Sequence, residues 1–125
     1  MIYLDTHVVL LLYLRKGDGL SERARQLIEY EPEILISPMV LLELDYLHEI
    51  GRTTLGSTAV YSYLHQRIDL QLCQKSFIDV VRVASVLSWS RDPFDRLITA
   101  QSAIDRNGLI TKDKIIQENY EHAVW

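Results

Sequence analysis

The sequence predicts an α/β sandwich with a mostly parallel central sheet. Short apolar runs typical of strands alternate with longer stretches of helical periodicity, which is the order expected of strand–helix units. The length of 125 residues suits one domain, and the five glycines and three prolines stand singly between elements rather than in linkers. In such sheets ligands bind beyond the carboxyl ends of the strands, so residues that directly follow a strand are the first candidates for a functional site.

In the first quarter of the chain, one strand leads into two helices. Ile2–Leu4 is a short β-prone run that stops at Asp5, and the apolar stretch Val8–Leu14 has helical length and ends before Gly17. Ser21 is the expected N-cap of a second helix. The residues expected on its inner face are Ala24, Leu27 and Ile28.

The middle of the chain repeats the strand–helix order. The apolar run 34–36 predicts a strand, and Ser37 with Pro38 opens a helix to about Ile50, because proline suits a first helical turn. A helix at 57–67, a strand at 68–72 and a helix at 76–87 are expected next. The apolar side of this last helix would carry Phe77, Val80, Val81, Ala84 and Leu87.

The last third of the chain is expected to close the sheet. Asp92 and Pro93 open a helix that ends at Asn107–Gly108, with the glycine as a left-handed cap. The run Leu109–Thr111 predicts a brief strand, and a short helical piece and a final strand at 122–125 complete the chain.

Composition excludes several classes of protein. The formal net charge of −4, from 13 basic and 17 acidic residues, argues against a protein that holds nucleic acid through bulk positive charge. The single cysteine, Cys73, excludes a disulfide framework and a cysteine-rich zinc site. No apolar run is long enough to span a bilayer and the apolar start lacks a basic leader, so no membrane association and a cytoplasmic location are expected.

Four carboxylates occupy positions that favour a metal site. Asp5 lies between two apolar runs, and Glu43 lies inside the most apolar helical stretch, where an unpaired carboxylate costs several kcal/mol. Asp95 falls in the first turn of a helix, and Asp113 follows a strand. An all-oxygen site of this kind suits Mg²⁺ or Mn²⁺, and its natural chemistry is phosphoryl transfer by metal-activated water.

Each of these acids, taken singly, also has an ordinary structural explanation. A position such as Asp113, between two lysines, is more often on the surface than at a metal. The joint pattern therefore carries the argument. The ordinary explanations are a turn for Asp5, a solvent-facing position or an ion pair with Arg52 for Glu43, a helix start shared with Asp92 for Asp95, and a surface turn for Asp113.

Four segments resemble the motifs of PIN-domain nucleases, in the family's order and across essentially the whole chain. The third segment is the most specific and resembles that of toxin ribonucleases of the VapC type. The resemblance implies a three-layer α/β/α sandwich and a single PIN-like nuclease domain at 1–125. The segments are Leu-Asp-Thr-His-Val-Val-Leu-Leu at 4–11, Ser-Pro-Met-Val-Leu-Leu-Glu-Leu at 37–44, Arg-Asp-Pro-Phe-Asp-Arg-Leu-Ile-Thr-Ala-Gln-Ser at 91–102 and Leu-Ile-Thr-Lys-Asp at 109–113.

By this resemblance, the chain is a Mg²⁺- or Mn²⁺-dependent endoribonuclease whose catalytic residues and metal ligands are Asp5, Glu43, Asp95 and Asp113. Asp5 and Asp95 are assigned to a first ion, while Asp113 and Glu43 hold ligating waters or help to bind a second one. His7 is expected to orient Asp5 or a backbone group. The supporting residues are Thr6, Asp92 and Thr111, and the candidate contacts to RNA phosphates are Arg91, Arg96, Lys112 and Lys114.

The same resemblance implies partners. A small antitoxin would cover the acidic pocket with a helix and a basic tail, and the toxin would form a homodimer. Tyr46, Tyr61 and Tyr63 lie on helices expected to face a partner. The alternative that remains open is a catalytically silent PIN-like module that only binds RNA or protein.

Overall fold

The computed structural model describes all 125 residues. Its centre is a five-stranded sheet in the order β3–β2–β1–β4–β5, in which every neighbouring pair is parallel. The predicted α/β class is therefore confirmed, and the sheet is wholly rather than mostly parallel. The strands are β1 (Ile2–Leu4), β2 (Ile34–Ile36), β3 (Gln71–Leu72), β4 (Gly108–Ile110) and β5 (Ala123–Val124).

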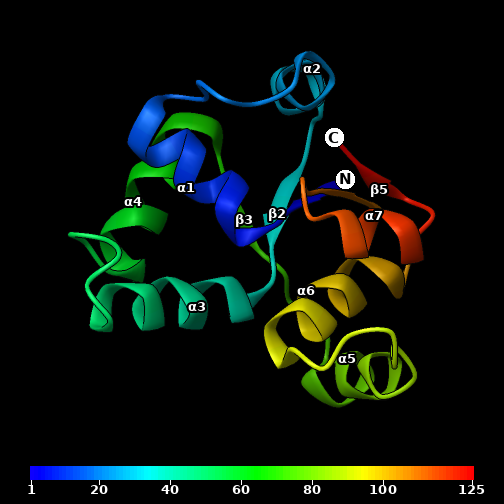
Figure 1. Ribbon diagram of the computed structural model, residues 1–125. Helices are drawn as coiled ribbons and strands as arrows, with labels where there is room; N and C mark the ends of the chain where they lie inside the picture. The colour runs from blue at the N-terminus through cyan, green and yellow to red at the C-terminus, as the bar shows by residue number, and fades with distance from the viewer.

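Helices cover both faces of this sheet, which gives the three layers of the predicted sandwich. Figure 1 shows α1 and α4 on one side and α5, α6 and α7 on the other, while β2 runs from α2 at one end to α3 at the other. No helix is long and apolar enough to cross a membrane. The helices are α1 (Thr6–Arg15), α2 (Glu22–Tyr30), α3 (Pro38–Glu49), α4 (Ser57–Ile68), α5 (Phe77–Ala84), α6 (Pro93–Ala103) and α7 (Lys114–Asn119).

Strand β1 is the centre of the core because all three of its residues are buried between the helical layers. It pairs with β2 on one side and β4 on the other, with Ile2 opposite both Ile34 and Gly108. A Cβ atom at Gly108 would lie 3.3 Å from Ile2 Cδ1. The glycine therefore allows close approach in the strand and is not the predicted helix cap; the left-handed residue after α6 is Arg106, with φ of 57°.

Two other predicted boundaries differ from the structure. The predicted strand at 68–72 is reduced to β3, because α4 continues through Ile68 and ends at Asp69, which adopts a left-handed φ of 53°. The predicted helix at 76–87 ends at Ala84. Its first residue, Phe77, is 68% exposed rather than on the inner side, because α5 packs mainly on α6 at the edge of the molecule.

The parallel sheet places the residues that follow β1, β2 and β4 at one edge. Asp5 follows β1 and caps α1, Ser37 follows β2 and caps α3, and Asp113 lies just beyond β4 and caps α7. Each cap side chain accepts a hydrogen bond from a backbone N–H of the helix that follows it. The strand ends and the helix starts therefore meet at the same edge, which is where the predicted site should lie.

Candidate active site

An open cavity of about 260 Å³ lies at this edge and is lined by carboxylates from α3, α6 and the ends of β1 and β4. It brings together all four acids predicted as metal ligands, although they are separated by up to 108 positions in the sequence. Thr6 and the predicted supporting residue Asp92 also line it, whereas Thr111 lies behind Asp5. The full lining is Asp5, Thr6, His7, Leu10, Glu43, Leu47, Asp92, Asp95 and Asp113.

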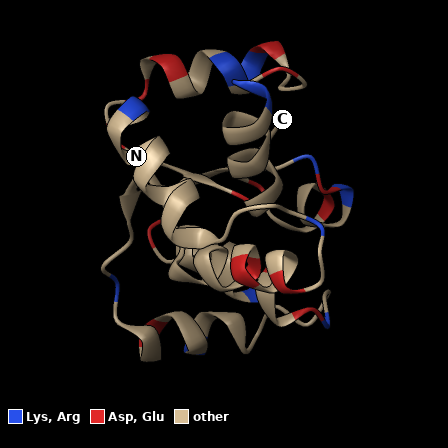
Figure 2. Cartoon of the chain, turned by 90° about the vertical axis from the view of Figure 1, so that its left-hand side faces the viewer, with Lys and Arg blue, Asp and Glu red and all other residues tan.

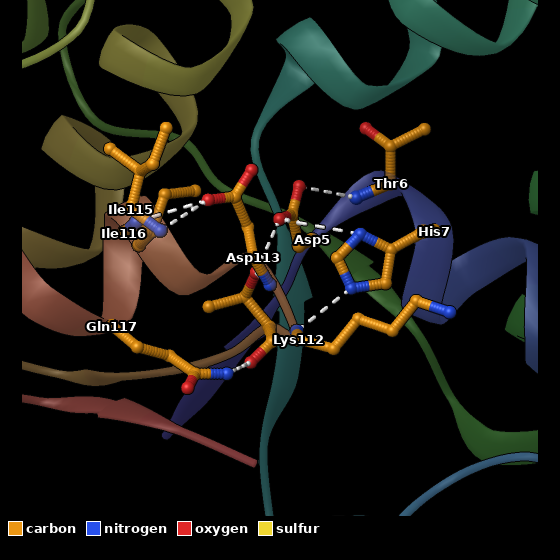
Figure 3. Close-up of polar contacts among 9 residues, drawn as sticks. Asp5, Thr6, His7, Lys112, Asp113, Ile115, Ile116 and Gln117 are labelled. Atoms are coloured by element: carbon orange, nitrogen blue, oxygen red, sulfur yellow. Dashed lines mark hydrogen bonds and ion pairs between the residues drawn. The ribbon is translucent and has the colours of Figure 1, made fainter.

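Asp5 is the most buried of these acids and is 4% exposed. Its Oδ1 accepts a hydrogen bond of 2.8 Å from the backbone N–H of Thr6, and its Oδ2 accepts one of 2.6 Å from the hydroxyl of Thr111 (Figure 3). The Thr111 hydroxyl in turn accepts the N–H of Asp113 at 3.1 Å. One threonine therefore ties the acid after β1 to the acid after β4.

Asp92 and Asp113 combine a helix cap with a place in the cavity. Oδ1 of Asp113 accepts the backbone N–H groups of Ile115 and Ile116 at 2.9 and 3.1 Å. Oδ1 of Asp92 accepts that of Phe94 at 2.8 Å and the N–H of the next residue at 3.4 Å. In both residues Oδ2 makes no hydrogen bond, and the positive end of a helix dipole favours the ionised carboxylate.

His7 links Asp5 to the loop that carries Asp113. Its Nε2 accepts the backbone N–H of Lys112 at 2.9 Å, so the ring proton is placed on Nδ1, which faces Asp5 Oδ2 at 3.6 Å (Figure 3). Burial lowers the pKa of His7, and the charge of Lys112 adds to this, while Asp5 and Asp113 oppose it. The neutral ring orients a backbone group, in agreement with its expected role.

The charges of the cavity are not balanced by basic side chains. None of its five carboxylates forms a salt bridge with lysine or arginine. Burial raises the pKa of Asp95 to about 7, and Asp92, Asp5, Asp113 and Glu43 raise it further in that order. Asp95 is therefore only partly ionised at neutral pH, because its burial and its acidic neighbours disfavour a further negative charge.

Glu43 and Thr6 face each other within the cavity. Burial raises the pKa of Glu43, and the charges of Asp5 and Asp92 add to the effect, while the nearby Thr6 hydroxyl lowers it. The Thr6 hydroxyl is buried and has no hydrogen-bond partner of normal geometry. A buried hydroxyl without a partner beside a carboxylate is a donor that a bound ligand or water could engage.

The donor set fits a hard divalent cation in its chemistry. Carboxylate and hydroxyl oxygens are the ligands that Mg²⁺ and Mn²⁺ prefer, and a cation would balance the charge that raises the pKa of Asp95. However, no three of the acidic or histidine side chains are grouped closely enough to hold an ion as they stand. The cavity therefore contains suitable ligand atoms but not a preformed group of three ligands.

Basic residues lie around the cavity rather than in it. Arg91, Lys112 and Lys114 are exposed and form no salt bridge. The guanidinium of Arg96 instead donates hydrogen bonds of 3.0 and 2.9 Å to the carbonyl oxygen of Ala84, at the end of α5. The structure thus gives Arg96 a helix-capping role. Figure 2 shows the basic segments scattered among acidic ones, without a continuous basic stripe.

Sequence reasoning did not single out Leu10 and Leu47, which form the apolar wall of the cavity. Leu47 lies one helical turn after Glu43 and Leu10 lies on α1 after Asp5. Their positions in apolar helical runs carry no signal that separates a cavity wall from the core. Spacing relative to Glu43 could have identified Leu47, because residues four apart share a helix face.

Comparison with known proteins gives the following similarities. Residues 2–121 match the family model of the PIN domain, whereas no curated protein sequence matches the chain. One similar solved structure is VapBC2 from Rickettsia felis bound to a DNA fragment from its promoter, with a TM-score of 0.67, 19% identity and coverage of 95% of this chain and 93% of that chain.

Two further solved structures share the fold. DNA-bound VapBC from Salmonella typhimurium has a TM-score of 0.64 and 18% identity, over 98% of this chain and 93% of that chain. FitAB bound to the IR36 DNA fragment has a TM-score of 0.56 and 17% identity, over 100% of this chain and 94% of that chain. The arrangement of strands and helices is therefore shared along almost the full length of all three.

Proposed function

Because the chain belongs to the PIN domain family, we propose that it is a metal-dependent endoribonuclease of the VapC toxin type. The observation that carries this proposal is the cavity in which Asp5, Glu43, Asp95 and Asp113 meet without a basic partner. The likeness of the fold to chains of VapBC complexes supports the toxin assignment.

In the proposed reaction, Asp5 and Asp95 hold a first Mg²⁺ or Mn²⁺, and Asp113 and Glu43 hold ligating waters or help to bind a second ion. The bound ion supplies an acidified water and a positive charge for the phosphate oxygens. The chain itself fixes Asp5 through Thr6 and Thr111. A cation held beside Asp95 would favour the ionised form of this carboxyl, whose pKa is raised to about 7.

The proposed substrate is RNA, which would lie across the mouth of the cavity. Arg91, Lys112 and Lys114 are exposed and adjoin the cavity-lining Asp92 and Asp113 in the sequence, so they are the proposed contacts to the phosphates of the RNA. Arg96 is not needed for this role, since its guanidinium caps α5. Because water is the attacking group, the products should carry a 5′-phosphate and a 3′-hydroxyl.

The test is RNA cleavage by the purified protein with Mg²⁺ or Mn²⁺ and with EDTA. The wild-type protein should cut only with the ion, and Asp5→Asn should be at least 100-fold slower. Asp79→Asn, which alters an exposed carboxylate of α5 that pairs with Arg82, is the matched control and should cut normally. Cleavage that persists in EDTA, or equally in Asp5→Asn, would refute the proposed chemistry.

A second candidate is a catalytically silent PIN-like module that only binds RNA or protein. The observation in its favour is that no three of the acidic side chains stand close enough to hold an ion. In that case the wild-type protein would bind RNA but leave it intact with either ion, and Asp5→Asn would bind it equally well.

We also propose a small antitoxin as partner and a homodimeric toxin. The similar structures are VapBC and FitAB complexes, and a basic segment of an antitoxin could enter the acidic cavity that no basic side chain of this chain fills. Expression of the chain alone should then arrest growth, and co-expression of its antitoxin should restore growth. Sedimentation of the purified toxin tests the dimer.

A further inference from the structure

A buried hydrogen bond joins the start of α3 to α6. The hydroxyl of Ser37, which caps α3, accepts the backbone N–H of Met39 at 3.1 Å and donates to Oε1 of Gln101 on α6 at 3.0 Å. Ser37 is 1% exposed and Gln101 is 4% exposed. Helices α3 and α6 contact each other, and Figure 1 shows the start of α3 beside α6. The two helices are thus linked by a directional contact away from solvent.

Lys75, in the loop between β3 and α5, holds the same part of α6 to β1. Its ammonium donates hydrogen bonds of 3.0 Å to the backbone carbonyl of Gln101 and to the hydroxyl of Tyr3, and it pairs with Asp105 at 3.1 Å. Tyr3 is the middle residue of β1 and donates to Cys73 Sγ at 3.0 Å. Gln101 is therefore held from two directions, through its side chain by α3 and through its main chain by a lysine bound to β1.

The three elements joined by these contacts carry three of the acids of the cavity. Glu43 lies six residues after Ser37 along α3, and Asp5 directly follows β1. Asp95 lies six residues before Gln101 along α6. Six positions on a helix correspond to about 9 Å, and a helix is stiff over that length. A shift of one helix against the other at the hydrogen bond therefore changes the distances between the carboxylates.

We propose that Gln101 is a positioning residue of the metal site, whose hydrogen bond with Ser37 sets the separation of Glu43 and Asp95. This inference rests on the proposed function, because it takes a divalent cation as the ligand of the cavity. Gln101 does not line the cavity and acts through the two helices. Partners that orient the ligands of a metal from behind typically contribute about 10- to 100-fold to its affinity.

Packing alone does not require a glutamine at this position. Polar side chains make up three of the five buried residues of α6, which are Ile98, Thr99, Ala100, Gln101 and Ser102. An apolar side chain of similar length would fill the same space without the cost of burying an amide. Because hydrogen bonds are directional, a satisfied buried polar contact favours one placement of the two helices over its alternatives.

The direct test measures Mn²⁺ affinity by calorimetric titration, well below the melting temperature of every variant. Gln101→Met keeps the length of the side chain but offers no amide oxygen to Ser37, and it should bind Mn²⁺ about 10-fold more weakly than the wild type. Ser37→Ala should lose a similar factor. The double variant should lose no more than either change alone, because both act through one hydrogen bond. Ser37→Thr keeps the hydroxyl and should retain wild-type affinity.

Ser57→Ala is the matched control for lost stability. The Ser57 hydroxyl donates to Asp45 Oδ2 at 2.8 Å, so this change removes a hydrogen bond that joins α3 to α4 instead of α6. The melting temperature should fall in this variant as it does in Gln101→Met, while the Mn²⁺ affinity should stay at the wild-type value. Equal weakening of Mn²⁺ binding in both variants would overturn the proposal, since loss of stability alone would then explain it.

A measurement without metal separates this inference from the proposed function. The rings of Tyr46 on α3 and Phe94 on α6 stack with centroids 6.2 Å apart and an angle of 28°, so nuclear Overhauser effects between them report how the helices lie. In EDTA these effects should weaken in Gln101→Met and persist in Ser57→Ala.

The two measurements together give a distinct result for each case. Wild-type Mn²⁺ affinity in Gln101→Met would overturn the positioning role, whether or not the ring contacts change. If the wild-type protein binds no Mn²⁺, the metal-dependent function fails and the ring contacts decide this inference alone. Ring contacts that weaken in Gln101→Met would then support the placement of the helices by Gln101, and unchanged ring contacts would overturn it.

Discussion

The acids of the cavity serve as structural caps and as candidate ligands at the same time. Asp5, Asp92 and Asp113 each accept backbone N–H groups at the start of a helix, and each also lines the cavity. A carboxylate that caps a helix can therefore also be a candidate ligand in the cavity. The helix caps explain why these carboxylates are held at one edge of the sheet.

Asp95 should lower the stability of the metal-free protein at neutral pH. Its pKa of about 7 in the folded protein lies above the ordinary value of 3.8, so ionisation opposes folding and the penalty grows as the pH rises from 4 to 7. After allowance for solvent screening, Asp95→Asn should stabilise the protein by about 1–2 kcal/mol at pH 7.5 in EDTA.

Thermal unfolding in EDTA at pH 7.5 and at pH 5 measures this difference. The gain in Asp95→Asn should shrink at pH 5, where wild-type Asp95 is already protonated in the folded state. An equal gain at both pH values would contradict the raised pKa, and a loss of stability at pH 7.5 would show that the carboxylate contributes favourable contacts.

Arg91 and Arg96 should behave differently although they lie five positions apart. Arg96→Ala should lower the free energy of unfolding by about 1.5–3 kcal/mol, because its charged hydrogen bonds to the end of α5 are lost. Arg91→Ala should leave stability unchanged and weaken RNA binding. Urea unfolding and RNA titration of both variants test this; equal effects of the two variants on RNA binding would contradict it.

At the scale of elements, the contact between α3 and α4 depends on one unexpected cap. Asp45 of α3 accepts the backbone N–H and the hydroxyl of Ser57, both at 2.8 Å, and so caps α4 from another helix. These hydrogen bonds lower the pKa of Asp45. Gly56 supplies no side chain, and a Cβ atom there would lie 2.9 Å from Asp45 Oδ1.

Gly56→Ala should therefore destabilise the protein although alanine fits the backbone there. The methyl group displaces the Asp45 carboxylate from Ser57, and the melting temperature should fall by about 3 °C at pH 7. Because the lowered pKa of Asp45 makes its contribution present above about pH 4 and lost below it, the deficit should vanish in acid.

The control for this effect is the same glycine change in an Asp45→Ala background. The two changes act through one contact, so Gly56→Ala should add no further loss there. Additive losses would show that the methyl group clashes with something other than Asp45.

The sequence predicted the order of elements well because strong local signals mark them. Proline after Ser37 and after Asp92, and the apolar runs of β1, β2 and β4, coincide with observed boundaries. Helix ends were less predictable: α5 ends at Ala84, whose carbonyl oxygen accepts hydrogen bonds from Arg96, and the left-handed residues Asp69 and Arg106 are not glycine. Contacts between distant residues decide such ends.

The sequence was enough to predict which acidic residues lie together, but not to predict their pKa values. Motif resemblance and strand ends pointed to Asp5, Glu43, Asp95 and Asp113, and the fold brings them to one cavity. Their burial and mutual distances set the pKa of Asp95, and only the folded chain contains that information. The Tyr46–Phe94 stack likewise joins two helices that the sequence separates by 48 residues.

For the whole molecule, the formal net charge of −4 can be compared with the number of acidic residues in the cavity. By formal count, the four proposed ligands belong to the 17 acidic residues, and the other 13 acidic residues equal the 13 basic residues in number. The cavity, which also contains Asp92, is therefore a concentration of acidic residues in a chain whose other charges are nearly balanced. RNA binding should consequently depend on the cation more than on total charge.

Divalent cations should stabilise the wild-type protein through this cavity. At an Mn²⁺ concentration 100 times the dissociation constant, one bound ion adds about 2.7 kcal/mol, and the melting temperature should rise by several degrees. Asp5→Asn should show little of this rise, while Asp79→Asn should show all of it. A rise of the same size in all three proteins would place cation binding outside the cavity.

The central claim is that the carboxylates of this cavity make the chain an RNA-cleaving enzyme. The most direct measurement is the sequencing of RNA 5′ ends in cells after induced expression of the wild-type chain and of Asp5→Asn at equal protein levels. The wild-type chain should generate new 5′-phosphate ends at defined sites, and Asp5→Asn should generate none. New ends of the same position and abundance in both, or in neither, would contradict the claim.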